Sequence, residues 1–199
     1  SIPVVINIAK VKKLFDEPDE RKVHKAVIPT LGGIGIFSGF IMAILMGSPA
    51  GANPQFQYLV AGAFIIFFLG LKDDIMILNA SKKFVVQLVA AGILIRFGGI
   101  YFHNLQGFLG IYEIPYLAGY LVSAFTIIVI TNSFNLIDGV DGLAGSLGFL
   151  TTIAFGIYFF MAGEISYAVM AFALSGSIAS FLLYNFAPAK IFMVDTGSL

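Results

Sequence analysis

The chain has 199 residues and a formal net charge of zero, with 59% hydrophobic and only 11% charged residues. A soluble globular domain carries about 25% charged residues, so this composition excludes that class and, with a mean hydropathy of +0.96, indicates membrane residence. The balanced charge gives no reason to expect a nucleic-acid partner, and the absence of cysteine excludes disulfides, thiolate catalysis and cysteine-based metal sites.

Six apolar segments, each nearly free of charge, follow one another along the chain: 31–46, 56–71, 84–102, 116–134, 143–162 and 165–186. About 20 helical residues cross the roughly 30 Å of hydrocarbon in a bilayer. We therefore predict an all-α fold, a polytopic transmembrane helical bundle with about six spans, as a single integral membrane domain over 1–199. The first two segments are short, so a re-entrant hairpin is an alternative for them.

The loops between these segments alternate between the two faces of the membrane. Segments 10–30, 72–83, 135–142 and 187–199 share one face, and this face contains ten of the eleven basic residues: Lys10, Lys12, Lys13, Arg21, Lys22, Lys25, Lys72, Lys82, Lys83 and Lys190. The positive-inside rule predicts that this face is cytoplasmic. The same face holds nine of the eleven acidic residues, namely Asp16, Glu17, Asp19, Glu20, Asp73, Asp74, Asp138, Asp141 and Asp195.

Carboxylates from three of these loops are candidates for one metal site. Asp73 and Asp74 directly follow a predicted span, where adjacent carboxylates repel each other and need a cation or a proton. Asn135, Asp138 and Asp141 recur every three residues, a spacing that stacks them along one side of a helical turn. Oxygen ligands without cysteine suit Mg²⁺, or alternatively Mn²⁺, and not zinc. Spare carboxylates are then free to act as bases.

A basic segment with Arg21, Lys22, His24 and Lys25 precedes Gly32-Gly33 on the same face. Such cations donate to phosphate oxygens, and a metal with cations around a diphosphate is the general arrangement for phosphoryl transfer. Two alternatives remain open: basic residues beside a span also determine topology, and glycines also allow tight helix packing.

Four motifs in this order resemble those of the bacterial polyprenyl-phosphate N-acetylhexosamine-1-phosphate transferases. They are Arg21-Lys22-x-His24 with Pro29-x-x-Gly32-Gly33, then Asp73-Asp74, then NSFNLIDGVDGL at 132–143, then FMVDTGS at 192–198. The resemblance covers the whole chain. The family's first spans and a C-terminal portion with further helices and a basic loop are missing, so we expect a fragment of a longer transferase that is inactive by itself.

The resemblance implies an enzyme of the bacterial inner membrane with a cytoplasmic active site. Its partners would be a UDP-N-acetylhexosamine, undecaprenyl phosphate and the lipid bilayer, and its products UMP and a lipid-linked diphosphate sugar that initiates cell-envelope glycan synthesis. The first and third motifs resemble the N-acetylglucosamine branch more than the phospho-muramoyl-pentapeptide branch, which is the alternative. The oligomeric state is left open, and a homodimer is allowed.

The resemblance also implies roles for individual residues. Asp195 would bind Mg²⁺ together with Asp74, and the catalytic carboxylates would be Asp73, Asp74, Asp138 and Asp141. Substrate would be bound by Arg21, Lys22, His24, Asn135, Phe192 and Lys82, with Phe192 stacking on uracil as aromatic rings do on bases. Lys82, Lys83 and Gln87 match weaker family positions, and the alternative for either lysine is a role in topology alone.

One departure from the family pattern is Val194, which replaces a glycine usual before the aspartate. A β-branched residue tolerates positive φ poorly, so we expect impaired activity if that glycine is needed for its backbone. The residues do not decide between direct attack by the lipid phosphate, which we favour, and a covalent aspartyl intermediate. An ion-coupled transporter is the rival from another class, and it predicts carboxylates near the middle of the membrane.

Overall fold

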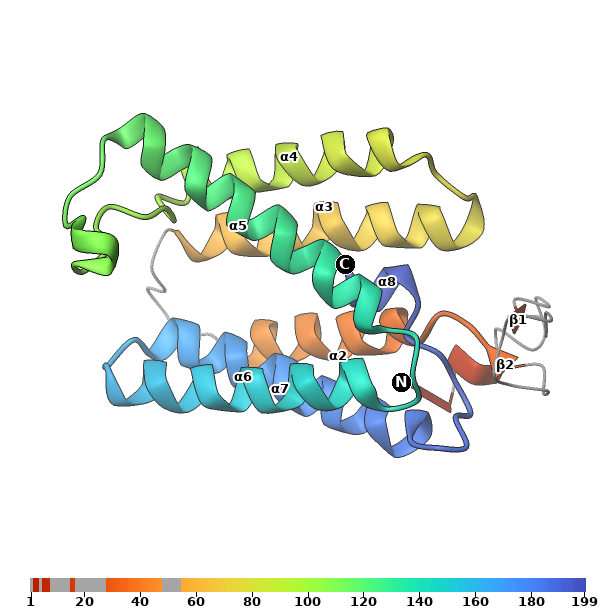
Figure 1. Ribbon diagram of the computed structural model, residues 1–199. Helices are drawn as coiled ribbons and strands as arrows, with labels where there is room; N and C mark the ends of the chain where they lie inside the picture. The colour runs from red at the N-terminus through yellow and green to blue at the C-terminus, as the bar shows by residue number, and fades with distance from the viewer. Residues whose placement is uncertain (1, 4, 8–14, 17–27, 48–54) are drawn as a thin grey trace.

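The computed structural model describes residues 2–3, 5–7, 15–16, 28–47 and 55–199 (Figure 1). Its long helices are α2 (Gly32–Gly47), α3 (Phe56–Ile75), α4 (Ala80–Arg96), α5 (Tyr116–Ile137), α6 (Leu143–Met161) and α7 (Ile165–Asn185). The short elements are β1 (Phe15–Asp16), β2 (Ile28–Pro29), the 3₁₀ turn η1 (Phe108–Gly110) and α8 (Asp195–Ser198). The predicted all-α helical class is confirmed; the extended pairings within the described residues are the antiparallel two-residue strands β1 and β2 and an isolated bridge between Asn104 and Glu113.

Three of the helices are long and apolar enough to cross a membrane: α5, α6 and α7, with 22, 19 and 21 residues. The apolar helix α2 has 16 residues and is shorter than a full span. Every one of the six apolar segments contains a helix, but six crossings are not confirmed, and membrane crossing by α2, α3 and α4 stays a prediction.

The long helices form two layers, α2 with α6 and α7 in one and α3 with α4 and α5 in the other (Figure 1). Helix α8 packs against both α2 and α3 and so joins the layers at one end of the bundle. The main core lies in the first layer, and its fully buried side chains include Phe181, Ile191 and Met193. Ile191 and Met193 belong to the segment that leads into α8, so burial in this core anchors that segment.

Helices α3 and α4 extend into the region predicted as the loop 72–83, and only residues 76–79 remain between them. The backbone hydrogen bonds continue across the polar residues, as in Met76 N to Lys72 O at 2.8 Å and Lys83 N to Asn79 O at 3.2 Å. Asp73, Asp74 and Lys83 are therefore carried by helical turns and not by a loop. Charge ends the apolar segment, but it does not end the helix.

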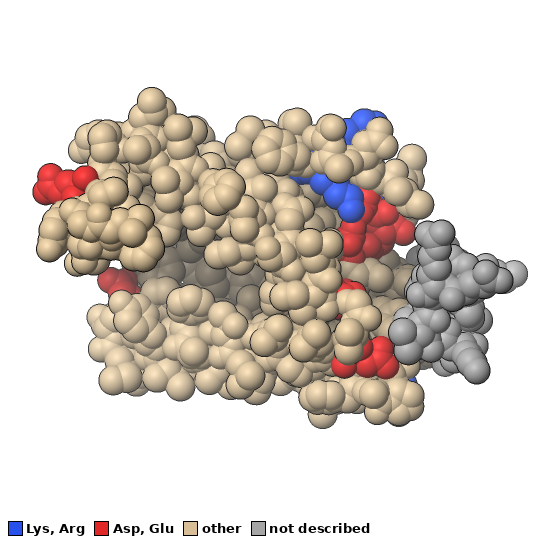
Figure 2. Space-filling view, in the orientation of Figure 1, with Lys and Arg blue, Asp and Glu red and all other residues tan. Residues whose placement is uncertain are grey.

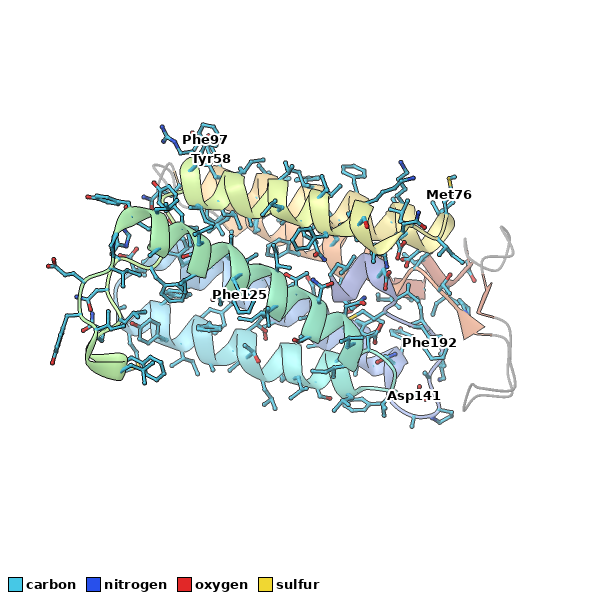
Figure 3. The ribbon with its side chains drawn as sticks, turned by 45° about the horizontal axis from the view of Figure 1, so that its top comes forward. Tyr58, Met76, Phe97, Phe125, Asp141 and Phe192 are labelled. Carbon is cyan, nitrogen blue, oxygen red and sulfur yellow. The ribbon has the colours of Figure 1, made fainter. Side chains whose placement is uncertain are left out.

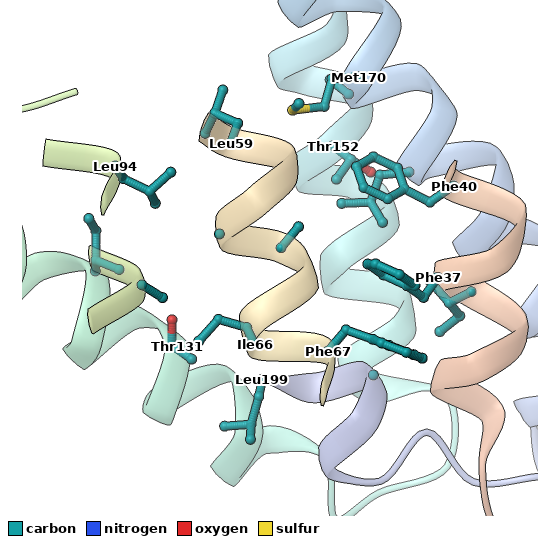
Figure 4. A pocket seen from close by; sticks show the side chains of 18 of the residues that line it. Phe37, Phe40, Leu59, Ile66, Phe67, Leu94, Thr131, Thr152, Met170 and Leu199 are labelled. Carbon is teal, nitrogen blue, oxygen red and sulfur yellow. The ribbon is translucent and has the colours of Figure 1, made fainter. Parts of the chain in front are cut away.

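An apolar cavity of about 780 Å³ lies between the two layers (Figures 2 and 4). Its walls come from α2 to α7, and α8 and the residue after it close the end nearest the charged residues. Labelled lining residues are Phe37, Phe40, Leu59, Ile66, Phe67, Leu94, Thr131, Thr152, Met170 and Leu199.

Candidate active site

Charged side chains gather at the end of the bundle where α3, α5 and α7 finish and α4 and α6 begin, on the right in Figure 2. We call this the charged end; Asp73, Asp74, Asp138, Asp141 and Asp195 lie here. Glu113 and Glu164 belong to connections at the opposite end. None of the described acidic residues lies in the middle of a long helix, which disfavours the transporter alternative.

Glycines allow the backbone of α8 to approach α2 and α3 closely. A Cβ atom added to Gly33 would lie 2.3 Å from Gly197 N, and one added to Gly70 would lie 2.3 Å from Asp195 O. The N–H groups of Gly32 and Gly33 donate to Phe192 O and Met193 O at 2.9 and 3.3 Å. Gly32 and Gly33 therefore allow tight backbone packing, which was the alternative left open for them in the sequence analysis.

Asp74 fixes the start of α8. Its carboxylate accepts hydrogen bonds from Asp195 N at 2.9 Å and Thr196 N at 3.0 Å, and a short one from the Thr196 hydroxyl. A carboxylate at this position satisfies N–H groups that a helix start leaves without partners. Burial raises the pKa of Asp74, although these hydrogen bonds oppose the shift. Asp74 therefore determines where the adjacent side chain of Asp195 lies.

The side chain of Asp195 is the centre of the charged end. Lys83 Nζ from α4 lies 2.7 Å from Asp195 Oδ2, and Asn135 Nδ2 from α5 donates to Asp195 Oδ1 at 2.6 Å. Lys83 also forms a close ion pair with Asp73, which is buried on α3 and accepts a hydrogen bond from Leu78 N at 2.7 Å. Groups from α3, α4, α5 and α8 thus converge on one point.

The two carboxylates beside Lys83 have different proton affinities. Burial raises the pKa of Asp73, and its contact with Asp195 raises it further. Burial alone would raise the pKa of Asp195 too, but hydrogen bonds with Asp73, Lys83 and Asn135 outweigh it and lower that pKa. Of the two carboxylates, Asp195 therefore releases its proton more readily.

Asp138 lies just beyond the end of α5 and accepts a hydrogen bond from the backbone N–H of Val194. Burial, assisted by the negative charges of Asp195 and Asp74, raises its pKa to about 7. A carboxyl group that titrates near neutral pH is suited to accept or donate a proton during a reaction.

The three polar residues spaced by three do not meet at one point. Asn135 contacts Asp195, Asp138 contacts Val194, and Asp141 accepts a hydrogen bond from Ala189 N at 3.1 Å. They contact successive parts of the segment that leads into α8, and Figure 3 labels Asp141 near this segment. The described contacts of Asp141 thus tie down the chain after α7, away from the Lys83 cluster.

Two carboxylates of the charged end, and no larger group among the described residues, are placed to bind a magnesium ion. Across the described ranges, no group of three or more histidine, aspartate or glutamate side chains converges in a geometry that could hold a metal. Asp73 and Asp195 nevertheless come from different helices and share one cation, the Lys83 ammonium group. Mg²⁺ usually takes one or two protein carboxylates and completes its shell with water and substrate phosphates, so this pair suits it.

The predicted substrate-binding residues other than Asn135 are not part of the Asp195 cluster as the structure describes it. Arg21, Lys22 and His24 lie outside the described residues. Phe192 is half-buried, and its N–H donates to Pro29 O at 3.0 Å (Figure 3). Lys82 is exposed, whereas its neighbour Lys83 reaches Asp195.

Two residues of this end had little prominence in the sequence. Lys83 precedes the buried Gln87 by four residues, so both lie on the same face of α4. This spacing was the signal in the sequence that favoured Lys83 over Lys82 as a site residue. The buried side chain of Asn185 accepts a hydrogen bond from Gly142 N at its Oδ1 and donates one from its Nδ2 to Ile191 O, both at 2.9 Å. Asn185 thus joins the start of α6, the end of α7 and the segment before α8. No motif indicated Asn185.

The backbone at Val194 has φ 50° and ψ −173°, a combination that belongs almost only to glycine. The positive φ that strains a β-branched residue is therefore present at this position. Val194 O accepts hydrogen bonds from Gly197 N and Ser198 N, both at 3.0 Å, so the strained residue supports the first turn of α8.

Comparisons with known proteins agree with these features. The model of the family described as glycosyl transferase family 4 matches residues 56–199. A Bacillus subtilis (strain 168) protein named "Probable undecaprenyl-phosphate N-acetylglucosaminyl 1-phosphate transferase" is 36% identical, over 99% of this chain and 55% of its own length. An undecaprenyl-phosphate alpha-N-acetylglucosaminyl 1-phosphate transferase of Yersinia pestis is 32% identical, over 93% of this chain and 52% of its own length.

A third relative is a decaprenyl-phosphate N-acetylglucosaminephosphotransferase of Mycobacterium tuberculosis (strain ATCC 25618 / H37Rv). It is 34% identical, over 92% of this chain and 49% of its own length. The chain thus spans about half the length of the curated relatives it matches.

Proposed function

This chain belongs to glycosyl transferase family 4, and we propose that the full-length protein transfers N-acetylglucosamine 1-phosphate from UDP-N-acetylglucosamine to undecaprenyl phosphate, releasing UMP. The names of its relatives support a polyprenyl-phosphate acceptor and an N-acetylglucosaminyl phosphate group. The observation that carries the proposal is the convergence of Asp73, Lys83 and Asn135 on Asp195 at the charged end.

In this reaction an oxygen of the lipid phosphate forms a bond to the sugar-linked phosphorus, and the bond from that phosphorus to the UMP oxygen breaks. Little covalent work is left for the protein, so positioning and charge stabilisation dominate. The Lys83 ammonium group, which pairs with Asp73 and Asp195 in the structure, would bind diphosphate oxygens, as lysine does at other phosphate sites. Asn135 orients Asp195 by donating to one of its oxygens.

Asp195 and Asp73 are the carboxylates that would hold Mg²⁺, since both face one cation, the Lys83 ammonium group, while Asp74 binds backbone N–H groups of α8. When bound, the ion would supply neutralisation of the charge on the diphosphate. Asp138, with its pKa near 7, would take the proton of the attacking lipid phosphate. Direct attack remains our preference over an aspartyl intermediate, because a diphosphate bound at this site offers its phosphorus to an in-line nucleophile and UMP is a competent leaving group.

The proposal places the charged end at the cytoplasmic face of the bacterial inner membrane, where a nucleotide sugar is available. Lys72, Lys82, Lys83 and Lys190 all belong to this end, in agreement with the positive-inside rule. The lipid-linked product would then enter cell-envelope glycan synthesis.

The test is transfer of radiolabel from UDP-N-acetylglucosamine into extractable lipid by membranes that contain the full-length protein. We expect lipid label with Mg²⁺ and none with a chelator. Asp195→Asn should lower the transfer rate by a factor of at least about 10², as when one group that stabilises the transition state is lost. Glu113→Gln, at the opposite end, is the matched control and should keep the wild-type rate. Label that stays aqueous with the wild-type protein, or an Asp195→Asn variant as active as wild type, contradicts the proposal.

A further inference from the structure

Two amide side chains bind each other one helical turn below the Asp195 cluster. Asn132 Nδ2 on α5 donates to Gln87 Oε1 on α4 at 2.9 Å, and Gln87 Nε2 donates back to Asn132 Oδ1 at 3.4 Å. Asn132 Nδ2 also donates to Ile128 O at 2.8 Å within its own helix. Among the described residues, this pair is the only side-chain hydrogen bonding recorded between α4 and α5.

The environment makes this pairing costly to break. Gln87 is only 2% exposed and lines the apolar cavity between the two layers. A buried amide without a partner keeps the full cost of leaving water, whereas a reciprocal pair satisfies both groups. The pair therefore holds α4 and α5 in a fixed register, with Gln87 buried and Asn132 half-buried.

The spacing connects the pair to the reaction site. Gln87 follows Lys83 by four residues on α4, and Asn132 precedes Asn135 by three residues on α5, so each amide lies on the face of its helix that carries a partner of Asp195. A shift of α4 against α5 would move Lys83 relative to Asn135, and the two could no longer bind opposite oxygens of the same carboxylate.

We infer that the Gln87–Asn132 pair is a positioning device for the proposed transfer, since it fixes the distance between Lys83 and Asn135 and thereby the orientation of Asp195. Neither amide touches the substrate in this account. The inference rests on the proposed function and extends it to residues outside the cluster.

The experiment measures kcat and KM for UDP-N-acetylglucosamine in purified full-length protein. Gln87→Leu and Asn132→Leu should each lower kcat about tenfold, with a smaller change in KM, and the double leucine variant should lose no more than either single one, because coupled residues are not additive. The exchange variant Q87N/N132Q preserves two facing amides of the same total length. It should recover kcat to within about threefold of wild type.

Ser123→Ala is the matched control for lost stability. Ser123 is 4% exposed on the far half of α5, where its hydroxyl donates to Gly119 O at 2.7 Å and accepts from Phe102 N at 2.9 Å. This variant should lower the thermal midpoint as much as the leucine variants and leave kcat unchanged.

If the wild-type protein transfers label and Gln87→Leu has the same kcat, this inference is overturned and the proposed function stands. A loss of kcat that the exchange variant does not restore, or that Ser123→Ala reproduces, overturns it as well. Absence of transfer by the wild-type protein overturns the proposed function and this inference with it.

Discussion

Replacing Val194 with glycine tests whether α8 depends on a strained backbone. The residue has φ 50° and ψ −173°, and a non-glycine residue held in such a region costs about 1–3 kcal/mol. Glycine removes this cost but loses about 0.5–1 kcal/mol through the greater freedom of the unfolded chain. The half-buried valine side chain also contributes packing, so Val194→Ala is the correct reference, because alanine loses that packing and keeps the Cβ atom.

We therefore expect Val194→Gly to be more stable than Val194→Ala by up to about 2.5 kcal/mol, the largest difference between the two effects. Thermal unfolding of the full-length protein in detergent gives the order of the midpoints. Transfer by Val194→Gly should equal or exceed that of wild type, since the hydrogen bonds from the N–H of residue 194 to the Asp138 carboxylate and from Ser198 N–H to the carbonyl oxygen of residue 194 use only the backbone of residue 194. A glycine variant with a lower midpoint than the alanine variant refutes the reasoning.

Three further predictions concern the cluster and its support. Lys83→Met should lower label transfer at least about tenfold, because an ion pair and a charge-assisted hydrogen bond are lost, whereas exposed Lys82→Met should stay near wild type; equal losses in the transfer assay would contradict the assignment. The transfer rate should rise from pH 6 to pH 8, because Asp138, with a pKa raised to about 7, accepts a proton only when ionised. A pH–rate profile of Asp138→Asn should be lower and lack this rise, and a wild-type rate that falls over the range would count against the role of base. Gly70→Ala should destabilise the protein by about 1–3 kcal/mol, because the new Cβ atom would lie 2.3 Å from a carbonyl oxygen of α8. Gly92→Ala meets nothing within 4 Å and should be neutral or stabilising, so similar midpoints for the two alanine variants in thermal unfolding would argue against the close packing.

The positions of the helices followed from hydrophobicity, but their ends did not. The segment predicted as 84–102 is a helix from Ala80 to Arg96, because polar Lys82 and Lys83 continue the helical hydrogen bonds and Gly99, with φ 66°, interrupts them. Hydropathy measures which residues leave water, and it carries no information on where backbone hydrogen bonds stop. Only three of six predicted spans meet the length and hydropathy of a crossing helix.

The candidate site was predictable in its acids and less so in its geometry. The sequence placed Asp73, Asp74 and Asp195 on one face, and the structure brings all three to the charged end. Nothing in a single sequence distinguishes an aspartate that caps α8 from one that faces a cation, since this depends on the distance between α3 and α8. The contribution of Lys83 likewise depends on which side of α4 faces α5.

The central claim is that segments far apart in the chain open to one compartment and there form the site. The chain has no cysteine, so single cysteines can be introduced by Ile77→Cys and Val140→Cys at the charged end, where the side chains are 98% and 63% exposed, and by Leu109→Cys at the other end, 82% exposed. A membrane-impermeant maleimide should label positions 77 and 140 only in inverted vesicles and position 109 only in intact cells. Labelling of positions 77 and 140 from opposite compartments would contradict the account.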